Sequence, residues 1–181
     1  MIVPAMNSKE LAIEVFKDLE TVDIKAMYLA QGLRREAVKS KFKYVKRVFE
    51  YKSRRLNLWL IIIDYYVKQP FFTIVVYYLD PSGLNGIMVD GNNQTLIHFT
   101  PHFLERYNER FLIQPKISKL ELLKRFIPAN SLEVIRVVPD NSSLENRIFG
   151  RFKEGIGLGL KEEFVGSSPT GPTQIIKHLQ F

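Results

Sequence analysis

The stretch LWLIIIDYYVKQPFFTIVVYYL, residues 58–79, decides the fold class of this chain. It is long enough to cross a membrane, but Asp64, Lys68 and Pro70 lie near its middle, where a membrane helix rarely carries charges. Both halves are rich in Ile, Val, Tyr, Phe and Thr, which favour strands. The stretch therefore predicts two buried strands joined by a polar turn, and we expect no membrane partner.

The residues before this stretch predict helices. Asn7 and Glu10 have the spacing of a capping box, and apolar residues then recur every fourth position. A second helix is predicted from about residue 21 to 38, with Gly32 weakening its interior. We therefore expect residues 1–40 to form a helical pair that acts as an N-terminal arm.

A strongly basic segment lies between the predicted helices and the apolar strands. Apolar residues alternate with basic ones from Phe42 onward, which indicates a strand, and residues 39–55 hold the densest positive charge in the chain. One interpretation is an edge strand that its charge protects from aggregation. The other is a nucleic-acid track in which Lys46 and Arg47 bind substrate.

The remaining residues predict an antiparallel sheet interrupted by two short helices. Residues 80–83 have the composition of a tight turn, and Asn85-Gly86 is a typical hairpin dipeptide. The run of glycines at residues 155–159 indicates strand kinks or bulges, because no helix follows to complete a phosphate-binding loop. The fold class is thus α+β, with residues 41–181 as one antiparallel domain. The expected strands after residue 90 are 94–99, 132–138, 147–153, 156–165 and 174–181, and the expected helices are 101–112 and 118–126.

Composition limits the functional classes. The chain has no cysteine, which excludes disulfides, thiolate zinc sites and cysteine nucleophiles. Its first residues lack the pattern of a signal peptide, so we expect a cytoplasmic protein. The formal net charge of +7 favours RNA or another polyanion as partner, although a solvated basic surface also explains it.

One predicted helix carries a pattern of basic side chains. Thr100 is a plausible N-cap and Pro101 suits the first helical position. At about 100° per residue, His102, Arg106 and Arg110 lie about 40° apart on one face. The two arginines repel each other by a few tenths of a kcal/mol, so an anion should lie nearby. It is either a neighbouring glutamate, a carboxylate from another element, or a bound phosphate.

His102 is the candidate group for proton transfer. The dipole at the helix N-terminus disfavours its protonation, so a neutral imidazole is available as a general base. His98, at the end of the preceding strand, is expected to approach the same place. The spacing of His98, His102 and Glu105 is not that of a zinc protease site, and we expect neither a metal nor a cofactor.

The order of these elements resembles a known family. A strand, Phe-Thr-Pro-His, a helix with Arg-Tyr-x-x-Arg, a second helix from Ile117-Ser118 and a β-meander are similar to the bacterial RelE and BrnT toxins over residues 96–181. The resemblance implies metal-independent cleavage of RNA by attack of the ribose 2′-hydroxyl on the adjacent phosphate. It also implies a protein antitoxin as a partner.

The resemblance also implies roles for single residues. His102 would be the base or acid, and Arg106 and Arg110 would stabilise the charge that develops on the phosphate. Arg147 or Arg151 on later strands would reinforce substrate binding. The alternative is a non-catalytic structural or protein-interaction module in which the arginines form internal ion pairs. A small-molecule enzyme would need an apolar pocket, which no sequence pattern locates.

Overall fold

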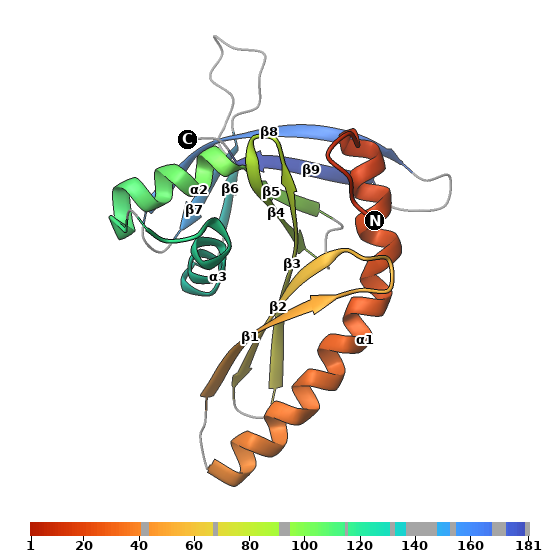
Figure 1. The fold of residues 1–181 in the computed structure, drawn as a ribbon, viewed down its shortest axis with the longest axis vertical. Helices are drawn as coiled ribbons and strands as arrows, with labels where there is room; N and C mark the ends of the chain where they lie inside the picture. The colour runs from red at the N-terminus through yellow and green to blue at the C-terminus, as the bar shows by residue number, and fades with distance from the viewer. Residues whose placement is uncertain are drawn as a thin grey trace.

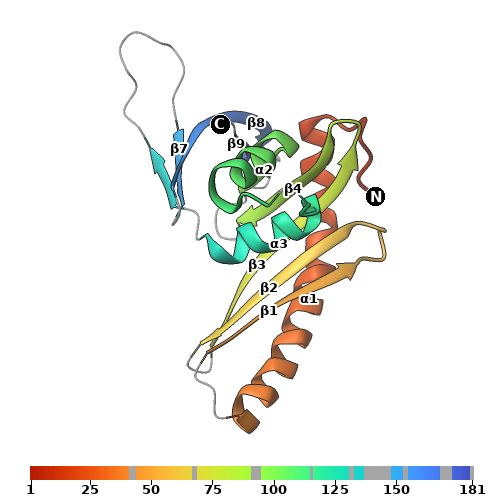
Figure 2. The ribbon, with the colours of Figure 1, turned by 60° about the vertical axis from the view of Figure 1, so that its left-hand side comes forward.

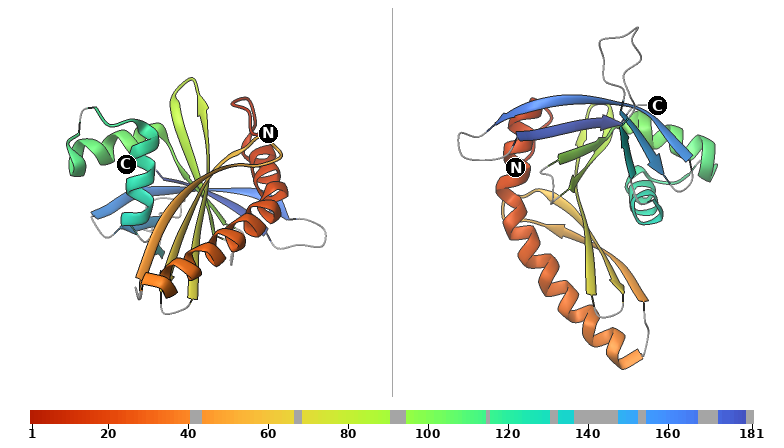
Figure 3. Two further views of the ribbon diagram at one scale, coloured as in Figure 1. Left: turned by 60° about the horizontal axis from the view of Figure 1, so that its bottom comes forward. Right: turned by 180° about the vertical axis from the view of Figure 1, so that it is seen from behind.

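A computed structural model describes residues 1–40, 44–66, 69–90, 95–114, 116–130, 133–136, 148–152, 155–167 and 173–179. In these residues one nine-stranded sheet has the strand order β1-β2-β3-β4-β5-β9-β8-β7-β6. The long helix α1 (Ser8–Ser40) covers one face, and α2 (Pro101–Tyr107) and α3 (Lys119–Ala129) lie on the other (Figure 1; Figure 3, left). The α+β prediction is confirmed. The strands are β1 (Tyr44–Lys52), β2 (Leu58–Tyr66), β3 (Gln69–Asp80), β4 (Gly83–Asp90), β5 (Thr95–Phe99), β6 (Glu133–Arg136), β7 (Ile148–Phe152), β8 (Gly155–Ser167) and β9 (Thr173–Leu179).

The apolar stretch forms the antiparallel hairpin β2–β3, as the sequence predicts. Its residues alternate between two cores. Trp59 and Ile61 pack toward α1, whereas Leu60 and Ile62 pack toward α2 and α3. Because helices cover both faces of these strands, both sets of side chains are buried, and the sequence is apolar without alternation.

Residues 8–40 form one helix, so the prediction of a helical pair is wrong. Its start is confirmed: the Asn7 and Glu10 side chains each accept a hydrogen bond of 3.0 Å from the other's backbone N–H. One buried stripe continues along the whole helix and crosses the expected break at Thr21. Packing of this stripe on the sheet outweighs the weak local signals at Thr21 and Gly32. The stripe consists of Leu11, Val15, Asp18, Val22, Ala26, Ala30, Leu33 and Ala37.

A buried carboxylate fixes α1 to the hairpin β1–β2. Asp18 is only 1% exposed, and its Oδ2 accepts hydrogen bonds from Ser53 Oγ (2.5 Å), Asn57 Nδ2 (2.8 Å) and Trp59 Nε1 (2.9 Å). Among the described atoms Oδ1 has no partner. Buried charge is tolerated only where donors converge on it, and here all three donors come from one hairpin. The carboxylate therefore fixes how the helix lies on the sheet.

A second acidic side chain, one turn earlier on α1, strengthens the same junction. Glu14 is buried and accepts two hydrogen bonds from the Arg55 guanidinium, at 2.9 and 2.6 Å. Asn57 Nδ2 adds a third at 3.3 Å. Chiefly because of Arg55, the pKa of Glu14 falls to about 2 from its ordinary 4.5. The folded state therefore favours ionised Glu14.

This low pKa predicts an acid-dependent loss of stability. Ionised Glu14 stabilises the fold fully above about pH 4.5, and this contribution disappears as the pH falls from 4.5 to 2. We expect Glu14→Gln to be less stable than wild type at pH 6, and nearly as stable at pH 2. Urea unfolding of both proteins across this pH range measures the difference between their free energies of unfolding, in which the contributions of the other titrating groups cancel. A difference that does not change with pH would contradict this role of Glu14.

The rest of the sheet departs from the prediction in two ways. Strands β5 and β9 are parallel, with Thr95 opposite Ile175, so the sheet is mixed. Asn85-Gly86 lies inside β4 and is not a hairpin turn. A Cβ on Gly86 would lie 3.0 Å from a Leu123 methyl group, so the glycine lets α3 approach the sheet. The turn between β3 and β4 is confirmed: Asp80 Oδ1 accepts hydrogen bonds from the next residues of the loop.

Two further features of the described chain bear on the sequence interpretations. β1 pairs only with β2 and ends the sheet, which agrees with the edge-strand interpretation of the basic segment. No helix in the described ranges is both long and apolar enough to cross a membrane.

Candidate nucleic-acid interface

Helix α2 begins as its sequence predicts. The Thr100 hydroxyl accepts a hydrogen bond of 3.2 Å from the Phe103 backbone N–H, and Pro101 occupies the first turn. Pro101, Phe103, Leu104 and Tyr107 are buried against the sheet and α3. With its apolar side fixed, the helix leaves His102, Glu105 and Arg106 exposed. Figure 2 shows α2 lying beside α3 on the same side of the sheet.

The helix continues as a π-turn, η1 (Asn108–Leu112). The Ile113 N–H donates to the Asn108 carbonyl five residues earlier, at 2.7 Å, and Ile113 ends the turn in the left-handed region at φ 51°. The Asn108 side chain closes the turn through two hydrogen bonds with the Gln114 backbone. A π-turn contains more residues than an α-turn, so Arg110 leaves the α-helical spacing that the sequence predicts. Such turns are frequent at functional sites.

All three residues of the predicted basic face are exposed: His102, Arg106 and Arg110. Arg106 Nη1 lies 2.8 Å from Glu109 Oε2, so a neighbouring glutamate is the anion next to this arginine. Both side chains of this pair are open to water, where an ion pair contributes about 0–1 kcal/mol. If a phosphate took the place of Glu109 beside Arg106, the fold would therefore lose little stability.

His98 does not join His102. Its Nε2 lies 2.8 Å from Asn85 Oδ1, and its ring stacks on Tyr78 at 6.5 Å. Because side chains alternate along β5, His98 shares the α1 side of the sheet with Leu96, while α2 covers the other side. The expectation that the two histidines meet is wrong. In the described part of the chain, no three His, Asp or Glu side chains are grouped as metal ligands.

Of the other predicted binding residues, Lys46 and Arg47 are not brought together. Lys46 contacts Asp64 at 3.1 Å and the Pro128 carbonyl of α3 at 2.8 Å. Arg47 turns to the opposite face of β1 and pairs with Glu36 of α1 at 2.6 Å. They therefore form no continuous track. Arg151 lies in β7, opposite Glu133 of β6, and Arg147 falls outside the described residues.

The basic side chains in and just before α3 were not predicted to be binding residues. Lys116 and Arg125 are exposed, and Arg125 donates to Gln114 Oε1 at 2.7 Å, next to the end of η1. Lys119 reaches back to Glu105 of α2 at 2.6 Å and ties the two helices together. Residues 116–125 contain four basic side chains and one acidic one, a signal that was available in the sequence.

Comparisons with protein-family models, with curated proteins and with solved structures gave no match for this chain. The resemblance to RelE and BrnT toxins therefore remains a prediction.

Proposed function

We propose that this protein binds RNA through the exposed basic side chains of α2, η1 and α3, which we call the basic helix surface. It consists of His102, Arg106, Arg110, Lys116 and Arg125. The observation that carries the proposal is the exposure of His102 and Arg106 on α2, whose opposite side is buried, and of Arg110 on the π-turn that continues this helix.

The chemistry of this surface suits phosphate groups. Arginine presents planar, permanently charged donors that match phosphate oxygens. Arg106 and Arg110 lie four residues apart in the continuous segment of α2 and η1. The aromatic core below holds these positions fixed, so little backbone entropy is lost when a strand of RNA binds. The ion pair of Arg106 and Glu109 opposes binding only weakly.

Binding accounts for these residues better than cleavage does. Attack by a 2′-hydroxyl needs one group to accept a proton and another to donate one to the leaving oxygen. Of the five residues of the basic helix surface, His102 is the one histidine, and the other four are three arginines and one lysine, which have no acceptor site for a proton. We therefore propose RNA binding without cleavage, and the experiment below detects cleavage if it takes place.

The test is fluorescence anisotropy with a labelled single-stranded RNA at several salt concentrations. We expect Arg106→Gln with Arg110→Gln to weaken binding about tenfold or more. It should also reduce the slope of log K against log salt by about 1.4, since each phosphate contact contributes about 0.7. The matched control is Arg34→Gln with Arg35→Gln, which removes two exposed arginines from α1 and should change binding little.

Two results would overturn the proposal: no binding by the wild-type protein, or equal losses in both double variants. The same RNA, incubated with protein and a chelator, is then run on a gel. Intact RNA agrees with binding alone. Cleavage that His102→Ala abolishes would replace simple binding by the ribonuclease activity that the toxin resemblance implies.

A further inference from the structure

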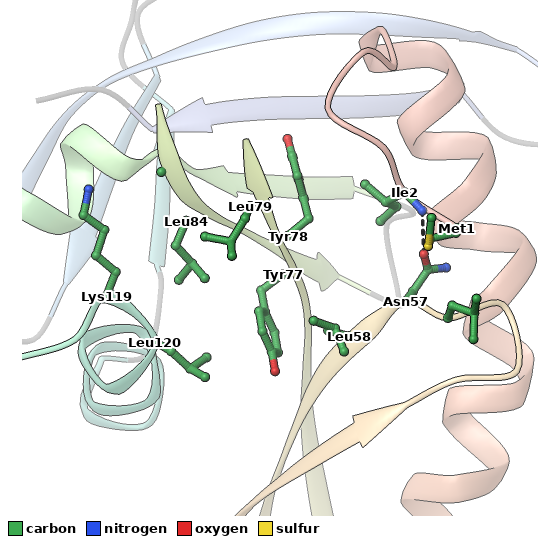
Figure 4. Close-up of a pocket in the computed structure, with 12 residues that line it drawn as sticks. Met1, Ile2, Asn57, Leu58, Tyr77, Tyr78, Leu79, Leu84, Lys119 and Leu120 are labelled. Carbon is green, nitrogen blue, oxygen red and sulfur yellow. Dashed lines mark hydrogen bonds between the residues drawn. The ribbon is translucent and has the colours of Figure 1, made fainter. Parts of the chain in front are cut away.

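A cavity of about 580 Å³ opens at another part of the molecule. It lies where the tips of the hairpins β1–β2 and β3–β4 separate, with the first residues of the chain on the α1 side and the start of α3 on the other (Figure 4). Its volume falls in the range of small-molecule pockets, which is about 300–1,000 Å³. No sequence pattern locates this cavity, because five separate stretches of the chain form its walls.

The walls of this cavity are mainly aliphatic. Leu58 of β2, Leu79 of β3, Leu84 of β4 and Leu120 of α3 line it, together with Leu56 from the β1–β2 turn. Leu79 is 69% exposed and Leu56 is 53% exposed. Single exposed leucines are ordinary, but several that face one concavity leave a contiguous apolar surface in water. An apolar ligand would bury this surface.

Leu56 is also held in an unfavourable backbone conformation. Its φ is 65°, in the left-handed region that glycine and asparagine tolerate and that leucine rarely adopts. The turn is closed by a hydrogen bond of 3.0 Å from the Leu56 N–H to the Ser53 carbonyl. A leucine that is both strained and exposed contributes little to folding, so its side chain is better explained by a contact with a ligand.

One end of the cavity is cationic. Among the described side chains that line it, Lys119 is the charged one, and its Nζ lies above Gly83, where a Cβ would be only 2.9 Å away. An ammonium group has three donors, and Glu105 accepts from one of them at 2.6 Å. The amino group of Met1, at the other end, is paired with Glu14. The amide of Asn57, at the other end, is already hydrogen-bonded to the Ile2 N–H, Glu14 and Asp18. Lys119 is thus the charged side chain of the wall that remains able to fix a ligand.

The aromatic residues of the wall add no competing charge. Tyr77 and Tyr78 are neighbours on β3, so their hydroxyls point to opposite sides of the sheet (Figure 4). Burial raises the pKa of Tyr78 to about 12, so its hydroxyl stays neutral at physiological pH. The described side chains between the two hairpin tips are therefore mainly apolar, and the charged side chain lies at the Lys119 end.

We propose that this cavity binds an aliphatic carboxylate, with the hydrocarbon chain along the leucine-lined wall and the carboxylate at Lys119. The site is separate from the basic helix surface, and it does not depend on RNA binding. A carboxylate at Lys119 lies close to Glu105, which repels it and competes for the ammonium group.

The test is calorimetric titration with hexanoate, octanoate and decanoate, and with the alcohols of the same length, below their micellar concentrations. Each added methylene should tighten binding about threefold to fourfold until the cavity is full, as expected for about 0.8 kcal/mol per buried CH₂. Decanoate should bind at least fivefold more tightly than decanol, and Lys119→Met should remove this preference. Glu105→Gln should tighten decanoate binding and leave decanol binding unchanged.

Side-chain variants place the ligand in the cavity. Leu79→Thr should weaken decanoate binding at least fivefold, whereas Phe71→Thr should leave it unchanged. Phe71 lies on the same strand and is 57% exposed, but it does not line the cavity. Leu56→Asn should weaken binding while raising the melting temperature, because asparagine relieves the strain at φ 65°. No binding of decanoate by the wild-type protein, equal losses in Leu79→Thr and Phe71→Thr, or no preference over decanol would overturn the proposal.

Discussion

Replacing Asp18 by alanine is expected to destabilise the protein by about 3–5 kcal/mol. The substitution removes the acceptor of three buried hydrogen bonds inside the helix–sheet junction. It leaves the donors of Ser53 and Trp59 without this partner, and it leaves Asn57 Nδ2 with its longer hydrogen bond to Glu14. Each buried donor that loses its partner costs about 1–3 kcal/mol. The expected loss is comparable to a large part of the total stability of a domain, so Asp18→Ala should be close to unfolding at room temperature.

Urea unfolding followed by far-ultraviolet circular dichroism measures this effect. Trp59 fluorescence gives a second signal, because it is the single tryptophan and donates directly to Asp18. Glu20→Ala is the matched control, since Glu20 is an exposed acidic residue on the same helix and its loss should change stability by about 0.5 kcal/mol or less. Asp18→Asn should cost less than Asp18→Ala, because its carbonyl keeps one acceptor. Equal stability of Asp18→Ala and Glu20→Ala would show that the network contributes nothing.

The Asp18 network also shapes the proposed ligand cavity. Asn57 donates to Asp18 and Glu14, and at the same time lines the cavity beside Leu56 and Leu58. The carboxylates on α1 therefore position the β1–β2 turn that forms one cavity wall. This coupling explains how a strained leucine can be held at the tip of a hairpin: the residues on either side are fixed by buried hydrogen bonds.

The local signals in the sequence were sufficient for the elements they mark. The predicted capping residues Asn7 and Thr100 each start a helix where expected, because an N-cap depends only on contacts within about four residues. The helix predicted from residue 118 begins one residue later, with Ser118 as its N-cap. The strand pair in residues 58–79 was predictable for a similar reason, since its composition leaves few alternatives.

Features that depend on distant contacts were not predictable. Helix α1 is continuous because its buried stripe packs on strands that follow it in the chain. The burial of Asp18 within this stripe depends on three hydrogen-bond donors from the hairpin β1–β2. The parallel pairing of β5 with β9 joins residues that lie far apart in the sequence. Asn85-Gly86 resembles a turn locally, but Gly86 is needed for the approach of Leu123.

The candidate site also contains features that the sequence predicts and features that it does not. The exposure of His102 and Arg106 follows from helical periodicity, which the sequence contains. The π-turn at Arg110 does not, because it depends on the hydrogen bonds that close the turn around Asn108. Lys46 and Arg47 were grouped by charge, although alternation along a strand already places them on opposite faces.

Phe126→Ala is expected to destabilise the protein by about 3–5 kcal/mol, mainly through the cavity that it leaves. Phe126 of α3 is nearly inaccessible to solvent, and its ring lies 5.4 Å from Phe99, 5.1 Å from Phe103 and 4.8 Å from Tyr107. These three residues belong to β5 and α2, so one side chain joins the strand to both helices of the basic helix surface. Edge-to-face ring contacts add to the burial energy.

Urea unfolding compares Phe126→Ala with Phe111→Ala and Phe126→Leu. Phe111 also touches Tyr107, at 5.4 Å, but it lies exposed on η1, so its loss should cost about 1 kcal/mol or less. Phe126→Leu keeps most of the volume and should be intermediate. If Phe126→Ala were no less stable than Phe111→Ala, the aromatic cluster would not be what holds α2 on the sheet. The rigid support that RNA binding requires would then have to come from the Thr100 cap and the contact between Lys119 and Glu105.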